Sequence, residues 1–194
     1  GTTPQTVNHG ASGSAVTATP NVGYHFTSWS DGVLTATRTD INVTGAITVT
    51  ASFAINTYTL TYNAGAGGSI TGSSPQTVNH GANGTAVTAA PNVGYHFTSW
   101  SDGGVIATRT DTNITGDLMV TASFSNEYTV TFDAQSGSTP APATKIVTYN
   151  AAYGALATTA RDSYVFSGWW TGPNGTGTEI AAATIVLMTS NHTL

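Results

Sequence analysis

An internal repeat is the feature that most constrains how this chain can fold. The stretch Pro4–Phe53 returns without gaps as Pro75–Phe124, and 39 of the 50 aligned positions are identical. Self-similarity at a fixed period indicates that each copy is one structural unit, stacked beside or strung after its neighbours. The repeat therefore predicts a tandem array of small domains instead of one large core.

Two kinds of segment in these copies alternate as half-buried β-strands do. YTLTY at Tyr58–Tyr62 and YTVTF at Tyr128–Phe132 place aromatic or aliphatic residues at every second position, with Thr between them. VTASF closes the first two copies in the same pattern, and turn-rich stretches such as NHGANG lie between. Thr suits a pleated surface, and Gly and Asn suit hairpin turns. No segment has a sustained 3.6-residue apolar period, so we predict a mainly β fold with little or no helix.

The central aromatic segment leaves two arrangements open. In a regular strand Tyr24 and Phe26 share one face and Trp29 lies on the other, and the second copy repeats the pattern. Either a β-bulge at the Thr-Ser pair returns Trp to the core, or Trp covers the opposite face of the sheet. The pattern favours burial of Tyr and Phe and does not decide the side of Trp.

Composition excludes several classes of protein. Charged residues make up 7% of the chain, against roughly 25% in an ordinary soluble domain. Four Lys and Arg face nine Asp and Glu, so there is no basic surface for nucleic acid or anionic lipid. Without cysteine, neither disulfides nor thiolate metal sites can stabilise the units. No apolar run reaches the roughly 18 residues of a membrane span, and the first residues lack a signal peptide, so we expect a mature piece or a fragment.

A third, diverged copy follows, and the motifs of all three resemble known repeats. Val147 precedes Tyr164 by the spacing that separates Val7 from Tyr24, and SYVFSGWW stands where GYHFTSWS stood. GYxFxxWSDG followed by VTASF resembles the divergent form of the internalin B-repeat of bacterial surface proteins. YTVTFDAQSG, the pair Tyr153-Gly154 and YVFSGWWT make the third copy similar to the related Listeria-Bacteroides repeat.

The resemblance implies tandem β-grasp-like units of about 70 residues between the functional head and the wall-anchoring end of a surface protein. It brings no catalytic residues with it. The third copy departs from the pattern, because Ala160 replaces Pro20 and Pro91, and Ser163 replaces Gly23 and Gly94.

We expect three domains: residues 1–56, which lack their first strand; residues 57–126; and residues 127–194, which lack the end of their last strand. A sheet without its first strand leaves an unpaired edge. Such an edge can accept a strand from another chain or from residues beyond this one.

Several residues with potential chemistry are better explained as structural. His25, Ser28 and Asp31 suggest a hydrolytic triad, but they lie on one extended segment, where His and Ser project to opposite faces. The SDG turns lack the further acidic residues of a calcium loop, so we interpret Asp as bonded to its own turn. His9 and His80 have no second metal ligand at a familiar spacing.

The few basic residues indicate local ion pairs and raise the question of a crosslink at the lysine. Arg38 with Asp40 recurs as Arg109 with Asp111, which we interpret as minor exposed pairs at a sheet edge. Lys145 is the only lysine, and an internal Lys-Asn crosslink would need an acidic partner that the sequence does not show.

The sequence favours a non-catalytic, extracellular or surface-exposed spacer with no cofactor and no metal. Linkers of three or four residues, Ala54–Thr57 and Ser125–Glu127, predict a semi-rigid rod of about 80–90 Å. Two alternatives remain: a filament subunit that accepts a strand from another copy at the incomplete repeat, and a glycan-binding module. The predicted glycan or partner contacts are Trp29, Trp100, Trp169 and Trp170.

Overall fold

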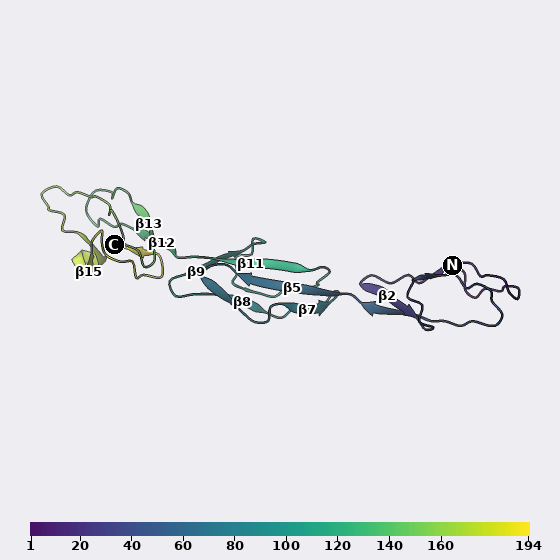
Figure 1. Ribbon diagram of the computed structural model, residues 1–194. Coiled ribbons are helices and arrows are strands. Elements are labelled where there is room, and N and C mark those ends of the chain that lie inside the picture. Colours follow the sequence, from purple (N-terminus) through teal and green to yellow (C-terminus); the bar gives the residue numbers. More distant parts are fainter. The chain divides into compact units, whose positions relative to one another are not determined.

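The computed structural model describes residues 1–194 and consists almost entirely of short β-strands and loops (Figure 1). The only helical element is the single 3-10 turn η1 (Pro173–Gly175). The prediction of a mainly β fold with little or no helix is confirmed. None of its elements is a helix with the length and apolar character needed to cross a bilayer.

The chain forms two compact units whose boundary crosses the second repeat. The first comprises residues 1–61, 75–86 and 110–119, and the second comprises residues 62–74, 87–109 and 120–194. This division differs from the sequence period, so the three domain limits expected from the repeat remain a prediction.

The first repeat contains two antiparallel strand pairs. β1 (Val16–Thr17) pairs with β3 (Thr37–Arg38), and β2 (Tyr24–Trp29) pairs with β4 (Ala51–Ile55). Each pair is a separate two-stranded sheet.

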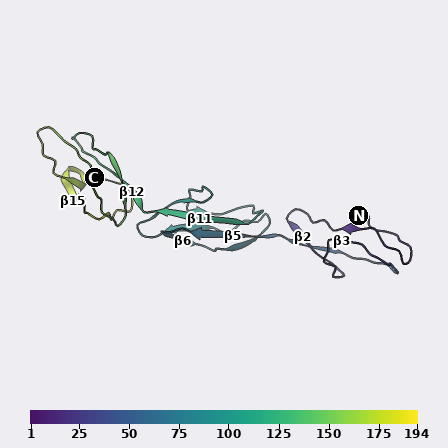
Figure 2. The same ribbon diagram turned by 45° about the horizontal axis from the view of Figure 1, so that its top comes forward.

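The second repeat builds larger sheets around the same two pairs. One has the order β7-β5-β11-β9, and the other has the order β10-β8-β6. In both views β5 and β11 run side by side (Figures 1 and 2), and the Gly65 N–H donates to Ala122 O at 2.8 Å. The strands are β5 (Thr57–Ala64), β6 (Gly68–Thr71), β7 (Gln76–Asn79), β8 (Val87–Pro91), β9 (His96–Trp100), β10 (Thr108–Arg109) and β11 (Leu118–Ser125).

The third repeat has a different set of sheets. β12 (Glu127–Thr131) lies between β13 (Thr144–Thr148), which is antiparallel to it, and β16 (His192–Thr193), which is parallel. β14 (Trp169–Gly172) pairs with β15 (Thr176–Ile180) across η1. β14 starts only at Trp169, so the aromatic residues that precede it are outside any strand.

A β-bulge decides the place of the tryptophan in the first two repeats. Phe26 pairs with Phe53 and Ser28 with Ser52, so Thr27 is the extra residue, and Thr98 is left out in the same way between β9 and β11. The bulge returns Trp to the core, where Trp29 is 9% and Trp100 is 1% exposed. The expected burial of Tyr and Phe is wrong for Tyr24, which is 45% exposed. Its counterpart Tyr95 is half-buried because its ring packs over Gly67, which has no counterpart among residues 1–56.

Each repeat has its own buried side chains. In β5 the buried Leu60 and Tyr62 alternate with Thr, as predicted, and the Tyr62 ring packs edge-on against the buried Trp100 with the ring centroids 6.2 Å apart. The core of the third repeat comprises Tyr128, Val130, Phe132, Val147, Tyr153, Ala157, Trp169, Ile180, Val186 and Leu194.

The connections between repeats are shorter than expected. Only Asn56 separates β4 from β5, and only Asn126 separates β11 from β12. Linkers of three or four residues are therefore wrong. The reason is that Ala54 and Ile55 pair with the start of β2, which extends the last strand of the first repeat.

Candidate functional site

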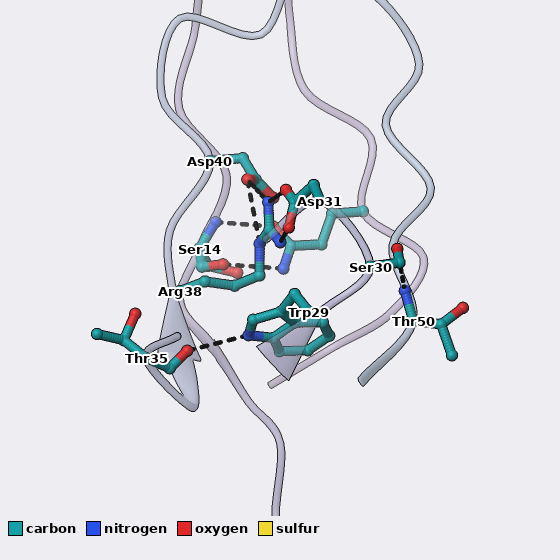
Figure 3. Close-up of polar contacts among 9 residues, drawn as sticks. Ser14, Trp29, Ser30, Asp31, Thr35, Arg38, Asp40 and Thr50 are labelled. Atoms are coloured by element: carbon teal, nitrogen blue, oxygen red, sulfur yellow. Dashed lines mark hydrogen bonds and ion pairs between the residues drawn. The ribbon is translucent and has the colours of Figure 1, made fainter. Parts of the chain in front are cut away.

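The most elaborate polar cluster of the first repeat is built on Trp29. The Arg38 side chain lies over the indole, with its Cζ atom 5.2 Å from the ring centroid, and two carboxylates hold its outer side (Figure 3). Asp31 accepts two parallel hydrogen bonds from Arg38 Nη1 and Nη2 at 3.0 and 2.9 Å, and Asp40 accepts from Nε at 3.2 Å. The Trp29 Nε1–H donates to Thr35 O at 3.0 Å. Arg38 is only 8% exposed, so the cluster covers the core tryptophan from above.

Local structure brings these residues together. The bulge at Thr27 turns the Trp29 ring inward, and the tight turn after it, closed by Gly32 N–H to Trp29 O at 2.9 Å, places Asp31 near Arg38. Arg38 reaches the ring from β3, the strand paired with β1.

The second repeat contains the same arrangement. Arg109 Cζ lies 5.1 Å from the Trp100 ring centroid, and Nη1 and Nη2 donate to the two oxygens of Asp102 at 3.1 and 2.8 Å. Trp100 Nε1–H donates to Ile106 O at 3.0 Å. The Tyr62 ring also faces the guanidinium, 6.0 Å away, so a strand that the first repeat lacks contributes to this copy.

Only part of this cluster is predictable from the amino-acid sequence. The Arg38–Asp40 ion pair is confirmed, but its description as a minor exposed pair is wrong because the guanidinium is buried against Trp29. The role of the SDG aspartate as the second carboxylate was missed. Its turn role is confirmed for Asp102, which accepts from Gly104 N–H at 3.3 Å. The signal that could have identified the pair is the recurrence of Trp, Asp and Arg at fixed spacing in both copies.

Electrostatics identifies the cluster as structural. Hydrogen bonds from Arg38 and Arg109 lower the pKa values of Asp31 and Asp102 below the usual aspartate value, and the two carboxylates raise the pKa of Arg38. A carboxylate of low pKa that is already bound to a guanidinium is poorly placed to act as a general acid or base near neutral pH. The cluster therefore stabilises the tryptophan cap and offers no free proton-transfer group.

The four tryptophans differ in what they can contact. Trp29, Trp100 and Trp169 are buried, and the Trp169 Nε1–H donates to Ala157 O at 2.8 Å. Three of the four predicted glycan contacts therefore have almost no exposed ring. Trp170 is half-buried, and its Nε1 lacks a hydrogen-bond partner although the atom itself is buried.

A cavity of about 310 Å³ lies beside Trp170 in the third repeat. Tyr164 and Phe166, which are 64% and 48% exposed, line it together with polar residues that include Asp133 and Asn174. The Arg161 guanidinium stacks over Tyr164 with Cζ 4.0 Å from the ring centroid. Aromatic faces and polar groups thus converge on this cavity.

The remaining candidate residues have separate partners. His25 Nδ1 lies 2.8 Å from Asn56 Oδ1, Ser28 stands opposite Ser52, and Asp31 holds Arg38, so the structure does not join the three as a triad. Lys145 Nζ donates to the backbone oxygens of Tyr153 and Ala155 at 2.6 and 2.7 Å. No three His, Asp or Glu side chains lie close enough together to hold a metal ion.

The lowered pKa values of Asp31 and Asp102 predict that the folded state loses stability in acid as these carboxylates become protonated. A depressed folded-state pKa stabilises the fold above the unfolded pKa, and this contribution disappears as pH falls through the folded pKa. We expect Asp102→Asn to lower the urea midpoint at about pH 7 and to change it little at about pH 2. Asp162→Asn, outside the cluster, is the matched control. Equal effects of Asp102→Asn at both pH values would contradict the assignment.

Family models match the whole chain. The divergent InlB B-repeat domain matches residues 1–57 and again residues 58–127, and the Listeria-Bacteroides repeat domain matches residues 128–194. No curated protein and no solved structure gives a significant match. These matches agree with the resemblance seen in the sequence. The chain belongs to the B-repeat families, with two divergent InlB B-repeats followed by one Listeria-Bacteroides repeat.

Proposed function

We propose that the chain is a non-catalytic spacer of a bacterial surface or secreted protein and acts outside the cell. The observation that carries this proposal is the single residue, Asn56 or Asn126, between the last strand of one repeat and the first strand of the next. Such a connection restricts rotation, while the buried tryptophan of each repeat belongs to that repeat alone. Membership of the B-repeat families supports the same role.

Charge supports a role in variable surroundings. Only 7% of the residues are charged, and the aspartates of the Trp-Arg-Asp clusters are bound to arginines within their own repeat. Dissolved salt screens the electrostatic interactions between exposed charges that lie far apart. A spacer with few such interactions keeps its dimensions as the ionic strength changes.

Label distances test the spacer directly, because the chain has no native cysteine to interfere. We expect spin labels at Ala46→Cys and Ala183→Cys, both exposed positions, to give one narrow distance distribution. Insertion of Gly-Ser-Gly-Ser after Asn56 should broaden it. Solution scattering should give a radius of gyration of about 25 Å, whereas a compact globule of this length has about 16 Å. The compact value, or equal widths with and without the insertion, would overturn the proposal.

A second candidate function is strand acceptance by the first repeat. This repeat has no counterpart of β5, and a groove of about 850 Å³ runs past Trp29, Val43 and Val49. In the second repeat Leu60 and Tyr62 occupy the corresponding place, and Val120 there is 2% exposed while its counterpart Val49 is half-buried. The groove therefore fits an added strand whose Leu and Tyr face inward and whose Thr face outward.

A filament built from identical copies is the less favourable source of that strand. The two strands of this kind, β5 and β12, already pair with β7 and β13 in their own repeats. A neighbouring copy would have to give up its own pairing to donate either strand. Sedimentation that depends on protein concentration would support a filament.

A peptide tests the groove. The sequence of residues 57–71, TYTLTYNAGAGGSIT, added to the full chain should protect the backbone amides of Gln5–Asn8 from hydrogen exchange. The reason is that the identical segment of the second repeat forms β7 against β5. The same peptide with Ser in place of Leu60 and Tyr62 should give no protection, since it lacks the inward side chains. Equal protection by both peptides, or by neither, would count against strand acceptance.

Glycan binding is a third proposal, and the observation that favours it is the aromatic cavity beside Trp170. Sugars stack on exposed aromatic faces and hydrogen-bond to neighbouring polar groups. The exposed rings of Tyr164 and Phe166 lie in this cavity beside the polar side chains of Asp133 and Asn174.

Polysaccharide titration monitored by tryptophan fluorescence tests it. We expect Tyr164→Ala, which leaves the reporter Trp170 in place, to remove a signal that Tyr95→Ala, in the second repeat, retains. No signal with the native chain, or a signal that survives Tyr164→Ala, would eliminate the proposal.

A further inference from the structure

The two junctions share one contact that the linkers alone do not explain. In each, the glycine of an Asn-Val-Gly-Tyr turn lies beneath the ring of a residue from the next repeat. A Cβ atom on Gly23 would lie 2.2 Å from Cδ2 of His80, and one on Gly94 would lie 2.1 Å from Cδ1 of Tyr149. Both glycines are buried and have a φ of +81°. His80 and Tyr149 occupy equivalent positions, two residues after Val78 and Val147.

Backbone hydrogen bonds at each junction also involve the single asparagine between the repeats. At the first junction Asn56 N–H donates to Gly23 O at 2.7 Å, and His80 N–H donates to Asn56 O at 2.8 Å. At the second junction Tyr149 N–H donates to Asn126 O at 2.9 Å.

The donor to the glycine carbonyl differs between the junctions. The Tyr128 hydroxyl donates to Gly94 O at 3.1 Å, in the role that the Asn56 amide has at Gly23. Two different donors reach the same acceptor, so the glycine carbonyl is a consistent part of the contact.

The remaining equivalents of these residues, His9 and Ser163, are both exposed. His9, equivalent to His80, is exposed in the first repeat. Ser163, which stands where the other repeats have glycine, is exposed and has a φ of +61°. The Cβ of Ser163 would occupy the space that the ring fills at the other turns.

We infer that the Asn-Val-Gly-Tyr turn and the ring that covers it form a directional coupling between consecutive repeats. The glycine carbonyl accepts a hydrogen bond at the junction, and a Cβ atom at the glycine would collide with the ring of the next repeat. The inference extends the spacer proposal, but it concerns one contact and can fail separately from it.

Paired glycine substitutions test the existing couplings. Gly32 and Gly103 also have positive φ values, +86° and +90°, but no atom lies within 4 Å of an added Cβ. Gly32→Ala therefore introduces the same backbone strain as Gly23→Ala without meeting a ring. We expect Gly23→Ala to speed hydrogen exchange of the Asn56 and His80 amides at least about tenfold, and Gly32→Ala to leave it unchanged. Unaltered Trp29 fluorescence would show that the repeat remains folded, and His80→Ala combined with Gly23→Ala should restore part of the Asn56 protection. Equal effects of the two alanine substitutions would overturn the coupling.

Discussion

Burial of one tryptophan per repeat is the interaction on which the rest of this structure depends. A ring of this size buries about 150–250 Å², which corresponds to roughly 4–6 kcal/mol of hydrophobic stabilisation at the usual coefficient. In a unit of some seventy residues without disulfides or metals, no other side chain contributes as much. The bulges at Thr27 and Thr98 turn this ring toward the core, and Arg38 and Arg109 cover its outer face. Asp31 and Asp40 hold the Arg38 guanidinium and Asp102 holds that of Arg109, so a cation that would otherwise be costly to bury becomes part of the core boundary.

The first two repeats differ in how completely their cores are covered, although their sequences are nearly the same. The segment QTVN is β7 in the second repeat, where it pairs with β5, and is not a strand in the first. Its counterpart Gln5 is exposed whereas Gln76 is buried, since no residues equivalent to Leu60 and Tyr62 cover the first repeat. A strand is a property of two paired segments, and four residues of identical sequence cannot form one without the partner.

The candidate sites were predictable to different degrees. Arg38 and Asp40 could be paired from their spacing and recurrence, but burial of the guanidinium depends on a turn that brings Asp31 from seven residues earlier. The four tryptophans looked equivalent in the sequence, yet three are buried and Trp170 is half-buried. Trp169 and Trp170 differ because they are neighbours in β14, where successive side chains point to opposite sides of the strand. The contact of Gly23 with His80 joins positions far apart in the sequence, so neither residue reveals it alone.

The amino-acid sequence by itself determined the repeat period, the β class, the strands that alternate Thr with apolar residues, and the family, because all of these are local patterns or direct self-similarity. Tertiary structure decided the side of the aromatic strand that faces the core, the partners of the aspartates and the way one repeat meets the next. The physical reason is that a single extra residue in a strand reverses every side chain beyond it. Whether that residue is extra depends on the register with a partner strand some twenty-five residues away in the sequence.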